Sequence, residues 1–405
     1  MVILEALNAL YGDCLLLRYP GPDRKERIWI IDGGPKAETV AGKKLVVWKD
    51  VLLPRLKQIN ATTPLPIALG MVSHIDDDHI NGIKALTSAL VAARPDQPAA
   101  VKFARFWFNS FDKLVGPKPA GLSEEAEAAT ASLQSLVSIN NLPGVDDDHA
   151  QLIMQSVGQG INLATDLRSL RLDGNKPIPD GFVMAKKGQQ KFEIEGAKVT
   201  VIGPLESRLE GLRKAWAKAL KKPTKKARQA ALQELFLPDK SLDKSVPNLS
   251  SIVVLVETGG RKLLLTGDAN GNDVVEAWKE LGLGTTPATI DLLKMPHHGS
   301  IRNTSEAFLK FFVADHYVFS ANGKYDNPDA PTLEALVKMH GKRKIVLHFT
   351  NEDVAWKKPF YKLEKDNTLV HNLKEMLPAL RAAYPGPWTA NLRKPADKSV
   401  VVNLA

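Results

Sequence analysis

The segment from Ser73 to Gly82, SHIDDDHING, carries several side chains that can bind a metal ion. They are His74, Asp76, Asp78 and His79. An apolar stretch at 64–73 predicts a strand before them, and in an extended chain residues 74, 76 and 78 share one side while 79 turns toward a second centre. Donors that converge from so short a loop favour metal binding. The alternative for this segment alone is an acidic, solvated turn with two incidental histidines.

Two later segments end in the same kinds of side chain. Asp268 follows a predicted strand at 262–266, and His297 and His298 follow one at 290–294. In α/β sheets, ligands bind at the edge where the carboxyl ends of strands meet, so these side chains are expected to lie together. A lone His-His pair is more often an interfacial or hydrogen-bonded pair. Beside the two other segments, it indicates a metal site.

The segment 145–150, VDDDHA, repeats the letters of the first motif without its context. Asn141, Pro143 and Gly144 precede it in place of an apolar strand. We expect a turn and a helix N-cap there, because carboxylates accept hydrogen bonds from the free amides of a first helical turn.

Together these motifs resemble the metallo-β-lactamase superfamily, and specifically its DNA-uptake (competence) branch, which has His-x-Asp-x-Asp-His where most members have His-x-His-x-Asp-His. The Gly-Asp at 267–268 and the His-His-Gly-Ser at 297–300 fit the same pattern, as do the segments 12–17, 30–34 and 248–251. The resemblance covers roughly 2–110 and 191–349. It implies an α/β fold, a four-layer αββα sandwich, here with helical insertions.

The resemblance also implies two divalent metal ions and a role for each motif residue. The ligands would be His74 and Asp76 for the first ion; Asp78, His79 and one of His297 and His298 for the second; and Asp268 between them. Asp78 and Asp268 would be the catalytic carboxylates. Asp32 would orient ligands by hydrogen bonding rather than bind metal.

The sequence departs from the family pattern at two places. No histidine occurs between His149 and His297, so the first ion lacks a usual ligand and would be held weakly, or completed by water, substrate or Asn248. Late in the domain, Tyr-Asp-Asn-Pro at 325–328 stands where the branch has Tyr-Gly-His-Pro. Asn327 can donate a hydrogen bond to a leaving group but cannot supply a proton.

The carboxylate of Asp76 in place of an imidazole favours Mn²⁺ or Mg²⁺, and Zn²⁺ also fits. Two such ions would hold a hydroxide suited to a phosphodiester, a lactone, a thioester or a β-lactam. Lys294, Ser300, Asn303 and Asn327 are candidates for substrate contacts. The alternatives are a strand cap for Lys294 and a turn-shaping role for Ser300 and Asn303.

Composition bounds the class of protein. The chain has 405 residues, 44% hydrophobic and 24% charged, as in ordinary globular proteins. It shows neither an apolar run long enough to span a membrane nor a signal peptide, and its single cysteine, Cys14, cannot form an intrachain disulfide. We therefore expect a cytoplasmic protein without membrane insertion.

The net charge of +9 favours an anionic partner such as nucleic acid. Much of it lies between 208 and 228, where Glu210 is the only acid. The basic residues there are Arg208, Arg213, Lys214, Lys218, Lys221, Lys222, Lys225, Lys226 and Arg228. Such a segment could contact phosphates, or it could be a solvated helix. Its single aromatic, Trp216, offers little for base stacking.

Alternating strands and helices must position these motifs. Strands are predicted at 2–7, 14–19, 28–32, 64–73, 191–194, 198–202, 251–257, 262–266, 290–294, 317–320, 345–349 and 399–404; helices at 44–59, 122–137, 151–170 and 373–383, and from 272, 305 and 332. We expect a hydrolase domain at 1–350 with a helical insertion about 111–180 and a basic helical insertion about 205–245. Residues 351–405 would be a C-terminal extension packed on it.

The expected function is metal-dependent hydrolysis, as a phosphodiesterase or nuclease acting on nucleic acid or a nucleotide-derived substrate through a metal-bound hydroxide. One alternative is a hydrolase of small esters or lactones whose helical insertion forms a lid. Another is a non-catalytic, metal-stabilised nucleic-acid-binding module. The sequence leaves open the natural substrate, the resident metal, the pathway and the oligomeric state.

Overall fold

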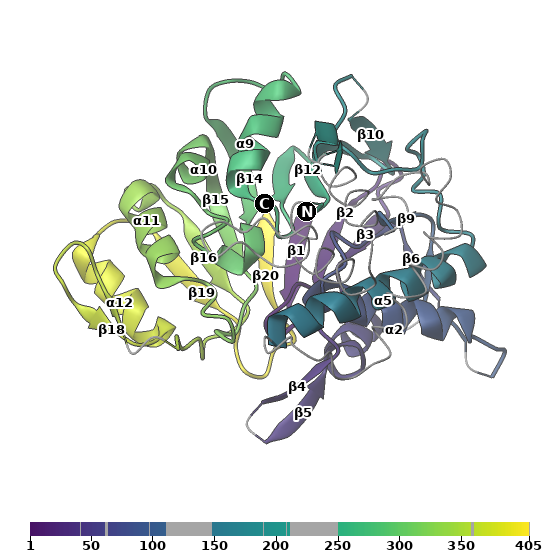
Figure 1. Cartoon of the computed structure of the whole chain (residues 1–405), viewed down its shortest axis with the longest axis horizontal. Helices are drawn as coiled ribbons and strands as arrows, with labels where there is room; N and C mark the ends of the chain where they lie inside the picture. The colour runs from purple at the N-terminus through teal and green to yellow at the C-terminus, as the bar shows by residue number, and fades with distance from the viewer. Residues whose placement is uncertain are drawn as a thin grey trace, which may run out of the picture.

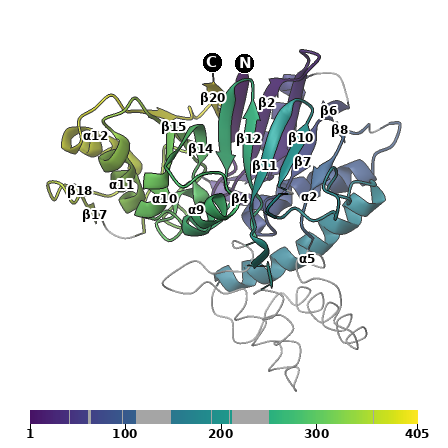
Figure 2. The same ribbon diagram turned by 90° about the horizontal axis from the view of Figure 1, so that it is seen from above.

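The computed structural model describes residues 1–40, 42–60, 64–96, 98–110, 148–188, 190–207, 209–210, 250–357 and 360–404. In the helix at 148–169, side chains are described from residue 159 onward. Two large sheets dominate it (Figures 1 and 2). The six-stranded sheet has the order β20 (Ser399–Leu404), β1 (Val2–Leu7), β2 (Leu15–Pro20), β3 (Glu26–Ile31), β7 (Leu69–Met71) and β9 (Phe106–Trp107). The eight-stranded sheet has the order β10 (Lys191–Ile194), β11 (Ala197–Gly203), β12 (Val253–Thr258), β13 (Arg261–Leu265), β14 (Ala288–Lys294), β15 (Phe312–Phe319), β16 (Val346–Phe349) and β19 (Thr389–Leu392).

The two sheets pack face to face, and helices cover their outer faces. Between the sheets lies an apolar core to which Leu17 of β2 and Val254 of β12 both contribute. On the outer face of the six-stranded sheet, α2 (Asp77–Val91) and α5 (Asp148–Ser169) cover side chains such as Leu16. On the other sheet lie α9 (Gly271–Glu280), α10 (Glu306–Phe311), α11 (Ala330–His340) and α12 (Leu373–Ala383). Since successive strand residues point to opposite faces, strands buried on both faces are apolar throughout. The result is a mixed α/β fold in four layers.

Strand direction brings the loops of interest to one edge. From β13 to β19, neighbouring strands of the eight-stranded sheet run parallel, so the loops after β13, β14, β15 and β16 emerge together. In the six-stranded sheet, β3, β7 and β9 are parallel to one another, which aligns the loop after β3 with the loop after β7.

Several predicted elements are confirmed with their bounds, and others are not. The strands at 2–7, 191–194 and 399–404 and the helix at 373–383 are as predicted. The single strand predicted at 64–73 is instead two: β6 (Leu65–Ile67) pairs with β8 (Val101–Phe103), while β7 pairs with β3 and β9. The helix predicted at 122–137 and nearly all of the basic segment lie outside the described residues.

The helix predicted at 44–59 is wrong in its first part. The chain forms a hairpin of β4 (Ala37–Val40) and β5 (Lys43–Val46), then a π-helix, η1 (Val47–Leu52), and α1 (Leu53–Ile59). The Asp50 carboxylate accepts a hydrogen bond from the Val46 amide at 2.7 Å, which starts the helix there. The apolar spacing from 46 to 56 does not distinguish the strand end from the first helical turn.

Residues 351–404 contribute to both sheets. They include a small hairpin, β17 (Tyr361–Lys362) with β18 (Leu369–Val370), then α12, β19 beside β16, and β20 beside β1. Between β19 and β20, the Arg393 guanidinium donates to the carbonyl oxygens of Thr350 at 2.5 Å and Asp397 at 2.7 Å. In the described part of the chain, no helix combines the length and apolar character needed to cross a membrane.

Candidate metal centre

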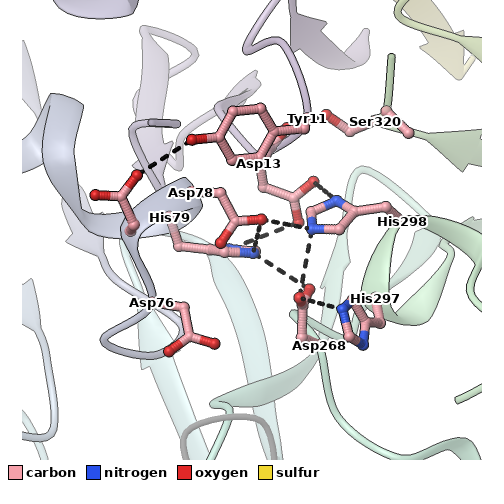
Figure 3. Close-up of polar contacts among 12 residues, drawn as sticks. Tyr11, Asp13, Asp76, Asp78, His79, Asp268, His297, His298 and Ser320 are labelled. Carbon is pink, nitrogen blue, oxygen red and sulfur yellow. Dashed lines mark hydrogen bonds and ion pairs between the residues drawn. The ribbon is translucent and has the colours of Figure 1, made fainter. Parts of the chain in front are cut away.

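The predicted ligands meet where the two sheets adjoin (Figure 3). The six-stranded sheet contributes the loop that follows β7 and the first turn of α2, which carry residues 74–79. The eight-stranded sheet contributes Asp268 after β13, and His297 and His298 in the short turn η2 (Pro296–Gly299) after β14. Residues as far apart in the chain as 79 and 268 therefore lie in one cluster.

Asp268 lies at the middle of this cluster and is approached by all four histidines. Its Oδ2 atom is 3.3 Å from His298 Nε2, 3.7 Å from His297 Nε2 and 3.9 Å from His74 Nε2. Its Oδ1 atom is 3.3 Å from His79 Nε2. The sequence prediction that these side chains lie together therefore agrees with the geometry.

The two remaining predicted ligands flank Asp268. Asp76 Oδ2 lies 3.6 Å from His74 Nε2. Asp78 Oδ2 lies 3.8 Å from His79 Nε2 and 3.1 Å from His298 Nε2. All seven predicted ligands thus belong to one network of imidazole nitrogens and carboxylate oxygens.

Each imidazole has its other nitrogen, Nδ1, beside an oxygen of a residue that is not among the seven predicted ligands. For His79 it is Asp32 Oδ2 at 2.9 Å, for His297 it is Asn303 Oδ1 at 2.9 Å, for His74 it is Ser73 Oγ at 3.0 Å, and for His298 it is Asp13 Oδ1 at 3.3 Å. A proton on Nδ1 leaves the Nε2 lone pair free, and this is how metal-binding histidines are usually oriented.

Asp32 acts on two of these rings. Its Oδ1 accepts a hydrogen bond from the Ser73 amide and its Oδ2 accepts one from the Ser73 hydroxyl, both at 2.7 Å. The same Oδ2 atom lies 2.9 Å from His79 Nδ1. Because the Ser73 hydroxyl donates to Asp32, its oxygen can accept from His74 Nδ1. Asp32 has the geometry expected of a residue that orients ligands.

Several polar atoms of the cluster are buried and make no hydrogen bond to the described residues. Among them are His298 Nδ1 and Asp13 Oδ1, which lie 3.3 Å apart. The others are His74 Nε2, His79 Nε2, Asp76 Oδ1 and Asp268 Oδ1. Buried polar atoms are nearly always satisfied, and each one that is not costs free energy. A divalent cation between these atoms would satisfy them together, so the donor set fits a metal ion.

Asp13, which sequence reasoning did not select as a site residue, belongs to the same cluster. Asp13, His79, Asp268 and His298 each offer a donor atom within 4.8 Å of the others, so this buried group could bind a metal ion. The signal was present in the Gly-Asp turn after the first predicted strand. A Cβ atom at Gly12 would collide with the carbonyl of Asp78, so the glycine allows this turn to approach α2.

The predicted substrate contact of Lys294 requires an accessible ammonium group, but its ammonium group is not accessible. Its side chain is fully buried, forms an ion pair with Asp13 and lies 3.9 Å from Asp268 Oδ1. Burial lowers the pKa of Lys294, but Asp13 and Asp268 outweigh it and hold the pKa above its usual value. The ammonium group is a counter-ion to the carboxylates of the centre. Of the two predicted roles, the strand cap agrees better with its place at the end of β14.

The other predicted substrate contacts differ in position. Asn303 is buried and holds His297 Nδ1 and the Asp268 carbonyl, which supports its turn-shaping alternative. Ser300 is buried, and its hydroxyl accepts a hydrogen bond from the Arg302 amide at 3.4 Å. Asn327 lies in the loop after β15, and its side chain makes no hydrogen bond within the described part of the centre. Asn248 lies outside the described residues.

In the cluster, the carboxylates and the imidazoles stabilise each other's charged forms. Burial raises the pKa of Asp268, but His298, His79 and His297 hold it well below its usual value. For Asp78 the same opposition leaves the pKa at about 2. Burial lowers the pKa of His79 and His298, and the surrounding carboxylates raise it well above the usual value. A cation entering the centre would replace these protons.

The backbone at the ligands is strained. His297 and His298 have φ values of 46° and 57°, and Asp32 has 57°, all in the left-handed region that side chains with a Cβ rarely adopt. Such conformations cost roughly 1–3 kcal/mol each and occur mainly where surrounding contacts enforce them, often at functional sites. Here the His297 amide is held by the Gly267 carbonyl at 3.2 Å, in the loop that carries Asp268.

Comparisons with known proteins give local similarity. No family model matches the chain. It is 33% identical over 107 residues, 26% of its length, to ComE operon protein 3 of Bacillus subtilis, and 34% identical over 93 residues, 23% of its length, to Recombination protein 2 of Haemophilus influenzae. The chain spans only 13% and 11% of these relatives. A solved structure of a CmlA beta-hydroxylase mutant aligns over 100% of this chain and 54% of its own, with 11% identity and a TM-score of 0.35.

Proposed function

We propose that this chain is a metal-dependent hydrolase of the metallo-β-lactamase fold that cleaves a phosphodiester, in nucleic acid or in a nucleotide-derived compound. The observation that carries the proposal is the centre around Asp268, where four histidines present Nε2 and have Nδ1 beside a second oxygen. The proposed hydrolase domain is 1–350, with insertions about 111–180 and 205–245. Residues 351–405 extend it and include β19 and β20, which are strands of the two large sheets.

We assign the donors to two ions that share Asp268. Asp78, His79 and His298 would hold one, because His298 Nε2 lies 3.1 Å from Asp78 Oδ2. His74 and Asp76 would hold the other. In Figure 3, Asp76 and His297 lie on opposite sides of Asp268 along the lower side of the cluster, away from Asp13.

This arrangement supports His297 as the ligand that replaces the missing family histidine. His297 Nε2 and His74 Nε2 approach the same oxygen of Asp268, at 3.7 Å and 3.9 Å. The adjacent pair would then serve both ions, one ring each. The sequence alone offered water, substrate or Asn248 for this position.

When bound, divalent ions would act as Lewis acids that lower the pKa of a bound water and balance charge developing on a phosphoryl oxygen. The protein supplies orientation and access. The side chains of Asp76, Asp78 and His297 are 15%, 18% and 25% exposed, while those of His74 and His79 are fully buried. Substrate and water would therefore enter from the side of the three partly exposed ligands.

The choice of a phosphodiester rests on charge and similarity. The net charge of +9 favours a polyanion, and the name of one relative refers to recombination, a process that acts on nucleic acid. Mn²⁺ and Zn²⁺ are the proposed ions, since the donor set mixes imidazole and carboxylate.

The test combines metal content with a substrate panel. The purified chain should contain Mn or Zn by mass spectrometry, and should cleave bis-p-nitrophenyl phosphate and a labelled oligonucleotide when one of these ions is added. Asp268→Asn, which keeps the side-chain size, should lower metal content and reduce cleavage at least 100-fold, roughly the scale of losing a central charge-stabilising group. The exposed carboxylate of Asp366 gives a matched control, and Asp366→Asn should behave as wild type.

Two results would contradict the proposal. Turnover of p-nitrophenyl acetate or a lactone without any phosphodiester cleavage would make the chain an ester or lactone hydrolase. Nucleic-acid binding that survives Asp78→Ala and His79→Ala, without turnover of any substrate in the panel, would make it a binding module.

A further inference from the structure

Four side chains beside the centre form a surface that the proposed chemistry does not use. They are Tyr11, Lys324, Tyr325 and Lys357, and we call them the aromatic–basic rim. They come from the loop after β1, the loop after β15 and the segment after β16. Three separate segments therefore bring two aromatic rings and two ammonium groups together.

The rings and the ammonium groups are in contact. The ring of Tyr325 is edge-on to that of Tyr11, with centroids 5.4 Å apart and an angle of 89° between the planes. Lys324 Nζ lies 3.8 Å from the Tyr11 ring centroid and 5.5 Å from that of Tyr325, and Lys357 Nζ lies 5.8 Å from the Tyr325 centroid. Tyr11 is buried, but Tyr325 is 39% exposed.

The rim is fixed to the centre at two points. The Tyr11 hydroxyl donates to Asp77 Oδ2 at 3.3 Å, between the proposed ligands Asp76 and Asp78. The Ser320 hydroxyl, at the start of the loop that carries Tyr325, donates to the Gly12 carbonyl at 2.7 Å. In the view of Figure 3, the Tyr11 ring lies at the side of the cluster where Asp13 and Asp78 are. Asp78 is one of the partly exposed ligands on the proposed entry side, and the Tyr11 hydroxyl contacts the residue before it, so the rim adjoins that side of the cluster.

The loop of Tyr325 is itself braced. Asp326 Oδ1 accepts the Lys357 amide at 2.5 Å, and Trp356 Nε1 donates to the Pro328 carbonyl at 3.0 Å. An aromatic ring presented from a fixed loop loses little conformational freedom on binding.

The two lysines have different surroundings. Lys324 pairs with Glu38 Oε1 at 3.3 Å, so its charge is already balanced. Lys357 is exposed, and within the described residues no carboxylate forms an ion pair with its ammonium group. Lys357 is therefore the rim cation available to an anion, while Lys324 ties the Tyr11 ring to the β4–β5 hairpin.

An exposed ring beside an unbalanced cation is what single-stranded nucleic acid requires: a base stacks on the ring and the adjacent phosphate meets the cation. We propose that the aromatic–basic rim binds single-stranded nucleic acid, with a base on Tyr325 and a phosphate at Lys357. This inference rests on the proposed function of the centre, since it supplies the nucleotide next to the bond that is cut.

The test measures binding apart from cleavage. Fluorescence anisotropy would follow a dye-labelled, single-stranded oligonucleotide with phosphorothioate linkages, which resist hydrolysis, on the full chain as purified. Stacking on one aromatic ring is worth about 1–3 kcal/mol, so Tyr325→Ala should weaken binding about 5-fold or more. Tyr325→Phe keeps the ring and should bind as wild type does.

Salt dependence tests the cation. Lys357→Gln should lower the slope of log K against log salt concentration by about 0.7, the value for one phosphate contact on a single strand. Lys310 pairs with Glu306 on α10 and is also exposed, so Lys310→Gln should leave the slope unchanged.

Defined outcomes overturn the inference. Equal binding by wild type, Tyr325→Ala and Lys357→Gln would do so, as would binding of duplex or anionic vesicles but not of single strands. A chain that binds single strands through Tyr325 and Lys357 but cleaves no phosphodiester with any metal would retain the rim and refute the hydrolase. Phosphodiester cleavage at the wild-type rate in both Tyr325→Ala and Lys357→Gln would retain the hydrolase and refute the rim.

Discussion

Lys294 is the residue whose surroundings differ most from what its type predicts. A lysine side chain is almost never fully buried unless it is paired, and this one is paired with Asp13 inside a cluster of carboxylates. The cluster also holds Asp78 and Asp268, and the charge of Asp268 acts to raise the pKa of Asp78. The fixed ammonium of Lys294 offsets part of that charge, and the proposed divalent ions would offset more of it.

Replacing Lys294 should therefore destabilise the fold. In Lys294→Met the buried carboxylate of Asp13 loses the ammonium that pairs with it, and breaking such a pair costs about 3–5 kcal/mol. The free energy of unfolding from urea titration should fall by this amount. The exposed Lys310→Met should change it by less than about 0.5 kcal/mol.

The cause can be isolated with a second substitution. Asp13→Asn added to Lys294→Met removes the stranded charge and should recover part of the lost stability, because the two side chains are in contact and their effects are not additive. If the double variant is less stable than Lys294→Met alone, the counter-ion role is wrong.

At the scale of elements, the first turn of α2 is held by the loop that follows β3. The Gly33 amide donates to the His79 carbonyl at 2.7 Å, and the Gly82 amide donates to the Gly34 carbonyl at 3.2 Å. A Cβ atom at Gly33 would collide with the backbone of Gly82 and Ile83. This close approach fixes where Asp78 and His79 stand relative to Asp268.

Gly33→Ala should consequently separate the loop from α2. We expect a lower melting temperature and a lower metal content per chain, although no ligand is removed, because Asp78 and His79 move away from the other donors. Gly174→Ala is a suitable comparison, since a Cβ there meets only the Lys176 side chain at 3.8 Å. Normal metal content in Gly33→Ala would show that the close approach does not position the centre.

The elements also mark the limits of sequence prediction. The motif at 74–79 and the donors after 266 and 294 could be placed together because each follows an apolar strand. Asp13 could not, because it lies in the turn between β1 and β2 and meets Lys294 of β14 only through the packing of the two sheets. For the same reason a basic side chain such as Lys294 could not be recognised as buried. Local periodicity carries no information about which loops meet across two sheets.

At the scale of the whole molecule, the centre depends on how the two sheets pack. One sheet carries Asp13 and residues 74–79, and the other carries Asp268 and His298. The last strand, β20, continues the first sheet beside β1, with Val2 opposite Leu404 and Leu7 opposite Ser399. Its inward side chains enter the core between the sheets, so the C-terminal residues help to set the distance between the two halves of the centre.

Adjacent valines of β20 test this dependence. Val402 is 1% exposed and lies in the core between the sheets, whereas Val401 is 40% exposed on the opposite face. Val402→Asp would bury an unpaired carboxylate and should lower the free energy of unfolding by about 3 kcal/mol or more. Val401→Asp introduces the same group into water and should change it by less than about 0.5 kcal/mol.

Metal content of the same pair then separates local from global effects. If sheet packing positions the donors, Val402→Asp should bind less Mn²⁺ or Zn²⁺ per folded chain than Val401→Asp, although both keep every proposed ligand. Equal metal content in folded Val402→Asp and Val401→Asp would mean instead that the loops hold the centre without help from the core, since a disturbance between the sheets would not have reached Asp268.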